Sequence, residues 1–102
     1  METDERFSET GSLIESSAGF SVRILGRTGL RYSEDHRSVW IDSEVLAKPG
    51  GAIALFKDSI KTWEDDADVQ VVSEADRDRI VGNIKRAFEF FGYELVVSRH
   101  VD

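Results

Sequence analysis

The chain contains no cysteine, a single proline and only two histidines among its 102 residues. The lack of cysteine excludes disulfides, thiolate catalysis and cysteine metal sites together. The length favours one domain with a single core, and the hydrophobic fraction of 40% is typical of a chain that folds.

Long apolar runs are also missing from the sequence. No stretch approaches the roughly 18 consecutive apolar residues that a membrane helix needs. The first five residues, Met1 to Glu5, are acidic and lack the basic and then apolar order of a secretory signal. We therefore expect a cytoplasmic protein that has no membrane partner.

Positive charge is scarce relative to negative charge. Thirteen Lys and Arg stand against twenty Asp and Glu, which gives a net charge of −7. Such a balance argues against binding to a phosphate backbone and favours basic or neutral partners. Arg23 and Arg31 fall on polar positions of neighbouring predicted strands, but pairing with Glu or Asp is a better reading of them than contact with nucleic acid.

Residues 1–19 differ in composition from the rest of the chain. They carry one basic and five acidic residues, and Leu13-Ile14 is their one apolar pair. A segment of this kind buries too little to offset its ordering entropy, so we expect a flexible acidic arm over 1–19 and a single α+β domain over 20–102. Leu13-Ile14 could anchor the arm in a groove or on a second copy of the chain.

From Phe20 onward, alternating apolar residues predict strands, and one strong helix follows them. The apolar run Ala52–Phe56 is typical of a strand covered on both faces, or of a strand in the middle of the sheet. The helix is predicted to begin after Ser73 as its N-cap and to end at Gly92. Its apolar stripe consists of Ile80, Ile84, Ala87, Phe88 and Phe91. The expected fold is α+β, with an antiparallel sheet of about five strands and this long helix packed on one face.

Residues that could carry catalysis form no convincing set. His36 falls in a predicted hairpin turn and His100 in the C-terminal tail, without ligand spacing between them. Gly26 to Gly29 lacks the following helix and lysine of a phosphate-binding loop. We therefore expect no enzyme, no cofactor and no metal site.

Most of the negative charge of the predicted domain lies in one short segment. Residues 63–78 hold seven acidic residues and one basic residue, a net charge of −6. Such a segment is often only a solvated loop, but it could also steer a basic partner. The predicted binding residues are Trp63, Glu64, Asp65, Asp66 and Asp68. A tryptophan at an acidic rim is a plausible anchor for a partner, although a tryptophan after a strand is often part of the core.

Several segments of the chain resemble a family of bacterial immunity proteins. They are Leu30-Arg31-Tyr32, Arg37 to Asp42, the Pro49-Gly50 bend with Ala52–Phe56, Ser59 to Trp63, Ser73 to Arg77, Ile80 to Ala87 and Phe90 to Leu95. Together they resemble the immunity protein seventy-four family of polymorphic toxin systems over residues 28–97. The resemblance implies an α+β protein that binds and neutralises a cognate toxin domain, and it transfers no binding residue.

The leading functional hypothesis is therefore an immunity protein that acts by steric and electrostatic occlusion of a toxin. The alternative hypothesis is a small structural or adaptor domain that self-associates through a sheet edge or the N-terminal arm. A regulator that binds nucleic acid is a third possibility, which the net charge disfavours. The sequence leaves the oligomeric state open.

Overall fold

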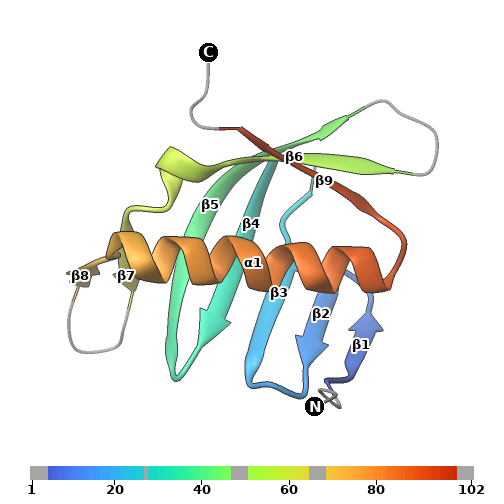
Figure 1. The fold of residues 1–102 in the computed structure, drawn as a ribbon, viewed down its shortest axis with the longest axis horizontal. Helices are drawn as coiled ribbons and strands as arrows, with labels where there is room; N and C mark the ends of the chain where they lie inside the picture. The colour runs from blue at the N-terminus through green and yellow to red at the C-terminus, as the bar shows by residue number, and fades with distance from the viewer. Residues whose placement is uncertain (1–4, 27, 47–50, 65–68, 99–102) are drawn as a thin grey trace.

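The chain folds into one long helix that lies across a strongly curled, mixed β-sheet (Figure 1). A computed structural model describes residues 5–26, 28–46, 51–64 and 69–98. This architecture confirms the predicted α+β class and the single long helix in the C-terminal half.

The sheet has the strand order β1-β2-β3-β4-β5-β6-β9, and β7 pairs with both β5 and β8. Its strands are β1 (Phe7–Thr10), β2 (Leu13–Ser16), β3 (Phe20–Ile24), β4 (Thr28–Glu34), β5 (Arg37–Leu46), β6 (Ala52–Phe56), β7 (Thr62–Glu64), β8 (Val69–Val71) and β9 (Glu94–Ser98). A short 3-10 helix, η1 (Lys57–Ser59), follows β6, and the long helix is α1 (Glu74–Phe90).

The described residues form nine strands, more than the five or so expected, and one pair is parallel. β6 and β9 run in the same direction, with Ala52 opposite Glu94. The reason is the connection between them, because a chain that returns through a helix re-enters the sheet in its original direction. The remaining pairs are antiparallel, as predicted.

Both ends of α1 are capped by the residues that the sequence predicts. The Oγ atom of Ser73 accepts a hydrogen bond of 3.0 Å from the backbone N–H of Asp76. At the other end, Gly92 adopts a positive φ of 79°, and the N–H groups of Gly92 and Tyr93 donate to the carbonyls of Glu89 and Phe88. This Schellman arrangement satisfies carbonyl groups that the helix itself leaves unpaired.

The core lies between α1 and the concave face of the sheet. Four of the five predicted stripe residues of the helix are completely buried, and Phe91 packs against them. From the sheet, every second residue points inward, including Val22, Tyr32, Val39 and Ile41. β6 is buried at four consecutive positions because it lies between β5 and β9, as the apolar run indicated.

The N-terminal segment departs from the expectation of a separate arm. Within residues 1–19, β1 and β2 form a hairpin whose second strand pairs with β3. Ile14 is fully buried in the core, and Phe7 packs on Phe20 with ring centroids 6.2 Å apart. The prediction of an arm is therefore wrong for residues 7–16. The hairpin is ordered by backbone pairing to a neighbouring strand and by two apolar side chains, which its average composition does not reveal.

Candidate functional site: a tryptophan cleft on the open face of the sheet

The face of the sheet that points away from α1 carries an exposed tryptophan. Because Val39 and Ile41 point into the core, the side chain of Trp40 between them projects to the opposite face, where it is 45% exposed. Trp40 lies opposite Arg31 on β4, which in turn lies opposite Arg23 on β3. The long helix α1 packs on the other side of the sheet, so these side chains lie on the face that α1 leaves open.

The position of Trp40 depends on a glycine in the next strand. Gly29 has a φ of +91°, and the pairing of β4 with β5 shifts register between Thr28 and Leu30. A Cβ built on Gly29 would lie 2.9 Å from the indole Nε1 of Trp40 and 3.6 Å from the side chain of Leu25. The missing side chain at this irregularity makes the room into which the indole settles.

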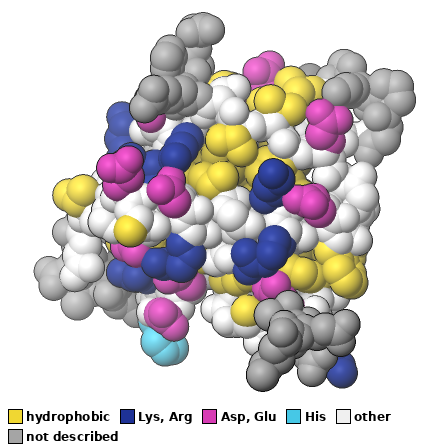
Figure 2. Space-filling model, viewed as in Figure 1, with side chains coloured by type: hydrophobic (Ala, Val, Ile, Leu, Met, Phe, Trp, Pro, Cys, Tyr) yellow, Lys and Arg dark blue, Asp and Glu magenta, His cyan; other side chains and the backbone are white. Residues whose placement is uncertain are grey.

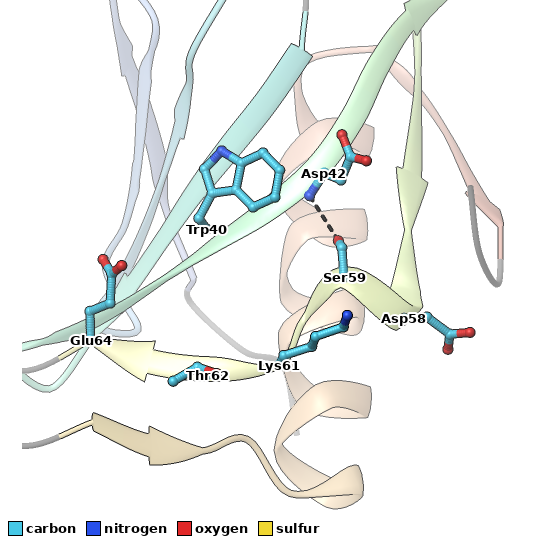
Figure 3. A pocket seen from close by; sticks show the side chains of 7 residues that line it. All are labelled: Trp40, Asp42, Asp58, Ser59, Lys61, Thr62 and Glu64. Carbon is cyan, nitrogen blue, oxygen red and sulfur yellow. Dashed lines mark hydrogen bonds between the residues drawn. The ribbon is translucent and has the colours of Figure 1, made fainter. Parts of the chain in front are cut away.

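Trp40 forms one wall of a cleft of about 540 Å³ between β5, η1 and β7 (Figure 3). Its lining residues are Trp40, Asp42, Asp58, Ser59, Lys61, Thr62 and Glu64. The floor is fixed by Ser59, whose Oγ accepts a 2.8 Å hydrogen bond from the backbone N–H of Asp42 and donates one of 2.6 Å to the carbonyl of Phe56. These two bonds join η1 to β5 and β6 at one end of the cleft.

Acidic groups outnumber basic groups in the lining of the cleft. Three carboxylates (Asp42, Asp58 and Glu64) stand against the single ammonium of Lys61. Glu64 is held in place by Arg31, whose Nη1 lies 3.1 Å from its Oε2 and also donates to Ser38. The rim thus presents a fixed carboxylate beside an exposed aromatic ring.

The five predicted binding residues do not share one environment in the structure. Glu64 lies on the rim of the cleft with more than half of its side chain exposed. Asp65, Asp66 and Asp68 lie outside the described residues. Trp63, in contrast, is only 1% exposed, so the prediction that it is an anchor at the surface is wrong.

Trp63 is a core residue because it alternates with its neighbours on β7. Thr62 and Glu64 point outward, which turns the indole of Trp63 toward Tyr32, at a ring distance of 6.3 Å. The guanidinium of Arg37 lies 4.0 Å from the centre of the indole ring. The pKa of Asp76 lies below its usual value chiefly because of Arg79, and the nearby indole N–H of Trp63 makes a smaller contribution without a hydrogen bond of good geometry.

The tryptophan that sequence reasoning missed as a surface residue is Trp40. The residues Val39-Trp40-Ile41 are typical of a strand, with a β-branched residue on each side of the tryptophan. The alternation of that strand already contained the signal, because two β-branched residues on the core face leave the tryptophan between them on the other face.

On the side of the molecule that α1 covers, several Lys and Arg side chains form ion pairs with Asp and Glu (Figure 2). Arg79 contacts Asp76 at 2.6 Å and Glu34 at 2.7 Å, and Arg86 contacts Glu5 at 3.1 Å. Tyr32 donates to Glu34 at 2.6 Å and accepts from Asn83 at 2.8 Å. These contacts fasten α1 to β4 and to the N-terminal segment.

The pKa of Glu34 reflects this pairing. Burial raises the pKa of its carboxyl, but the hydrogen bonds from Tyr32 and Arg79 outweigh that effect, so the pKa lies below its usual value. Arg79 likewise holds the pKa of Asp76 below its usual value. Burial and the neighbouring Glu34 raise the pKa of Tyr32. These groups serve the helix contact and leave the open face as the better candidate site.

One of the two histidines, His36, lies among the described residues. His36 lies in the β4–β5 turn, where it and Asp35 adopt positive φ angles of 65° and 49°, and His100 lies outside the described residues. Across the described ranges, no three His, Cys, Asp or Glu side chains are grouped so that they could hold a metal ion. In the same ranges, no helix combines the length and apolar character needed to span a membrane.

Comparison with known proteins identifies the family of this α+β protein. A family model described as Immunity protein 74 matches residues 22–98. Since the match covers well over half of the chain, the chain belongs to the Immunity protein 74 family. Searches of the curated proteins and of the solved structures returned no match.

Proposed function

We propose that this chain is a cytoplasmic immunity protein that binds a cognate toxin domain through the open face of its sheet and blocks it. Membership of the Immunity protein 74 family supports a toxin as the partner. The observation that carries the choice of surface is Trp40, an exposed aromatic side chain in a cleft with an acidic lining.

The physics of protein interfaces supports this choice of surface. A tryptophan whose remaining area becomes buried in a partner is a frequent hot spot, whereas the surrounding polar rim contributes mainly specificity. Trp40 can lose its exposed 45% in this way, and Trp63 has nothing left to bury. Trp40 therefore replaces Trp63 as the proposed aromatic anchor.

The acidic residues keep their proposed role as steering groups. Glu64 is on the rim of the cleft, and Asp65, Asp66 and Asp68 follow it directly in the chain. Negative charge in this region would attract a toxin with a basic surface, raise its rate of association and orient it. Blocking would then be steric, because the docked immunity protein occupies the basic surface that the toxin needs.

The test requires the cognate toxin domain, which is to be sought among the genes that neighbour the gene of this chain. We expect the two proteins to co-purify and the activity of the toxin to fall when this chain is added. Trp40→Ala should weaken the complex by at least tenfold, since truncation of a hot-spot residue costs about 2 kcal/mol or more. Phe90→Ala is the matched control, because it removes an exposed aromatic ring from the helix side. Equal loss in both variants, or no loss in either, would place the interface elsewhere.

Self-association through a sheet edge remains a second candidate function, favoured by one observation. β1 is the last strand of the sheet path, and beside it Phe90 is 58% exposed while its ring packs 5.1 Å from that of Phe7. An unpaired edge next to an apolar patch can pair with a second copy. Sizing of the wild-type chain and of Phe90→Asp tests it: a dimer that Phe90→Asp dissociates supports this function, and a wild-type monomer contradicts it.

A further inference from the structure

The geometry points to a more specific role for the cleft, namely that it receives the guanidinium group of an arginine side chain presented by the toxin. This inference rests on the proposed function and adds the chemistry of the contact. In the proposed complex, the arginine lies against the exposed face of the Trp40 indole, and its charge is met by the carboxylates of Asp42 and Glu64.

The aromatic wall is the first part of the argument. A cation over an indole face is attracted by the negative face of the ring, and arginine does this most often because its flat group can also stack. The protein already contains such a contact in its interior, where the guanidinium of Arg37 lies 4.0 Å from the ring centre of Trp63. Trp40 is the other tryptophan of the chain, and among the described residues no Lys or Arg lies over its ring.

The charge of the cleft is the second part. The lining carboxylates that the proposal uses, Asp42 and Glu64, against the one ammonium of Lys61 favour a cationic occupant and oppose a phosphate or a carboxylate. Arg31 contacts Oε2 of Glu64 at 3.1 Å, and a carboxylate has acceptor sites for a further donor. Arg31 therefore orients Glu64, and the incoming arginine would share that carboxylate.

Substitution of Lys61 should change the affinity for a cation in the opposite direction to substitution of the carboxylates. Its ammonium is the single basic group in the lining and opposes any cation that enters the cleft. Removal of that charge should therefore strengthen binding of a cation. A merely structural role of the cleft residues would not produce this gain.

The probe for the test is N-acetyl-arginine amide, with N-acetyl-norleucine amide as its uncharged counterpart. In the ¹⁵N-labelled protein, the two indole N–H signals are assigned with Trp40→Phe. We expect the arginine probe to shift the Trp40 signal saturably in the millimolar range and to leave the Trp63 signal in place. An equal response to the norleucine probe, or no saturable response to arginine, would overturn the proposal.

Variants then resolve the contribution of each wall. Glu64→Gln should weaken binding of the arginine probe about threefold to tenfold, and Lys61→Met should strengthen it by a similar factor. Glu15→Gln is the matched control. Glu15 lies on β2, three strands away from β5, and the strand pairing places it in the same cross-strand row as Ser38 and Glu64. A response to Glu15→Gln as large as that to Glu64→Gln would contradict a specific site.

The outcomes separate this inference from the proposed function. If the chain neutralises the toxin but the cleft variants bind the arginine probe no differently from wild type, only the arginine site is wrong. If the probe binds as expected but the toxin is not neutralised, the arginine site stands as a property of the cleft and the proposed function is wrong.

Discussion

The indole Nε1 of Trp40 lies 2.9 Å from the position that a Cβ would occupy on Gly29. The two residues stand on neighbouring strands, at the point where β4 and β5 shift register. Gly29 thus acts as a positioning residue for the exposed indole, and its conformation at φ +91° is one that other residues adopt only with strain.

Gly29→Ala is accordingly expected to destabilise the protein by about 1–3 kcal/mol, from backbone strain and from the clash with the indole. Urea unfolding measures the loss. Gly82→Ala is the control: an added Cβ at Gly82 meets nothing within 4 Å, and alanine should stabilise the helix by up to about 1 kcal/mol. Equal stabilities of Gly29→Ala and wild type would show that the close approach imposes no cost.

Substitution of the two tryptophans should destabilise the protein to very different degrees. Trp63→Ala empties a buried site and should cost about 3–5 kcal/mol of unfolding free energy, whereas Trp40→Ala should cost less than about 1 kcal/mol. Fluorescence gives an independent check. Trp40→Phe, which retains Trp63, should emit at shorter wavelength and resist acrylamide quenching, and Trp63→Phe should show the reverse. Similar quenching of both variants would contradict the burial of Trp63.

The stability of the fold should fall on acidification, partly through Glu34. Because the pKa of Glu34 is lowered in the folded protein, its carboxylate stabilises the fold above its unfolded pKa of about 4.3. That contribution is lost as the pH falls through the lower folded value. Glu34→Gln should therefore cost about 2 kcal/mol at neutral pH, and this cost should shrink as the pH falls below the unfolded pKa of about 4.3. A difference that stayed constant with pH would show that the Glu34 charge is not involved.

Charge reversal in the acidic segment tests the steering role. The double variant Asp65→Lys and Asp66→Lys should slow association with the toxin at low salt and flatten the dependence of that rate on salt concentration. Stopped-flow mixing measures both quantities. Glu9→Lys with Glu89→Lys changes the net charge by the same amount at two exposed positions outside residues 63–78 and serves as the control. Unchanged kinetics in the first variant would remove the segment from the interface.

Local features of the sequence account for the parts of the fold that were predicted well. Ser73, Gly92 and the apolar stripe of α1 determine the helix without help from distant residues, because capping and period are properties of neighbours along the chain. The β4–β5 hairpin and the buried β6 follow in the same way from alternation and from an unbroken apolar run.

The errors share a different cause, which is that they concern contacts between distant segments. Residues 7–16 look too polar to fold alone, yet Ile14 is buried because β3 lies beside it and α1 lies above it. Trp63 looks like a surface anchor beside acidic residues, yet Tyr32 and Arg37 from the β4–β5 hairpin enclose it. Neither environment can be read from the composition of the segment itself.

The sequence by itself determined the α+β class, the limits of the helix and the kinship with Immunity protein 74. Only the tertiary structure decided that Trp63 is enclosed, that Glu64 meets Arg31, and that a cleft opens between β5 and β7. The physical reason is that caps and periodicity depend on residues a few positions apart, whereas exposure depends on which strands and helices close over a side chain after the chain has folded.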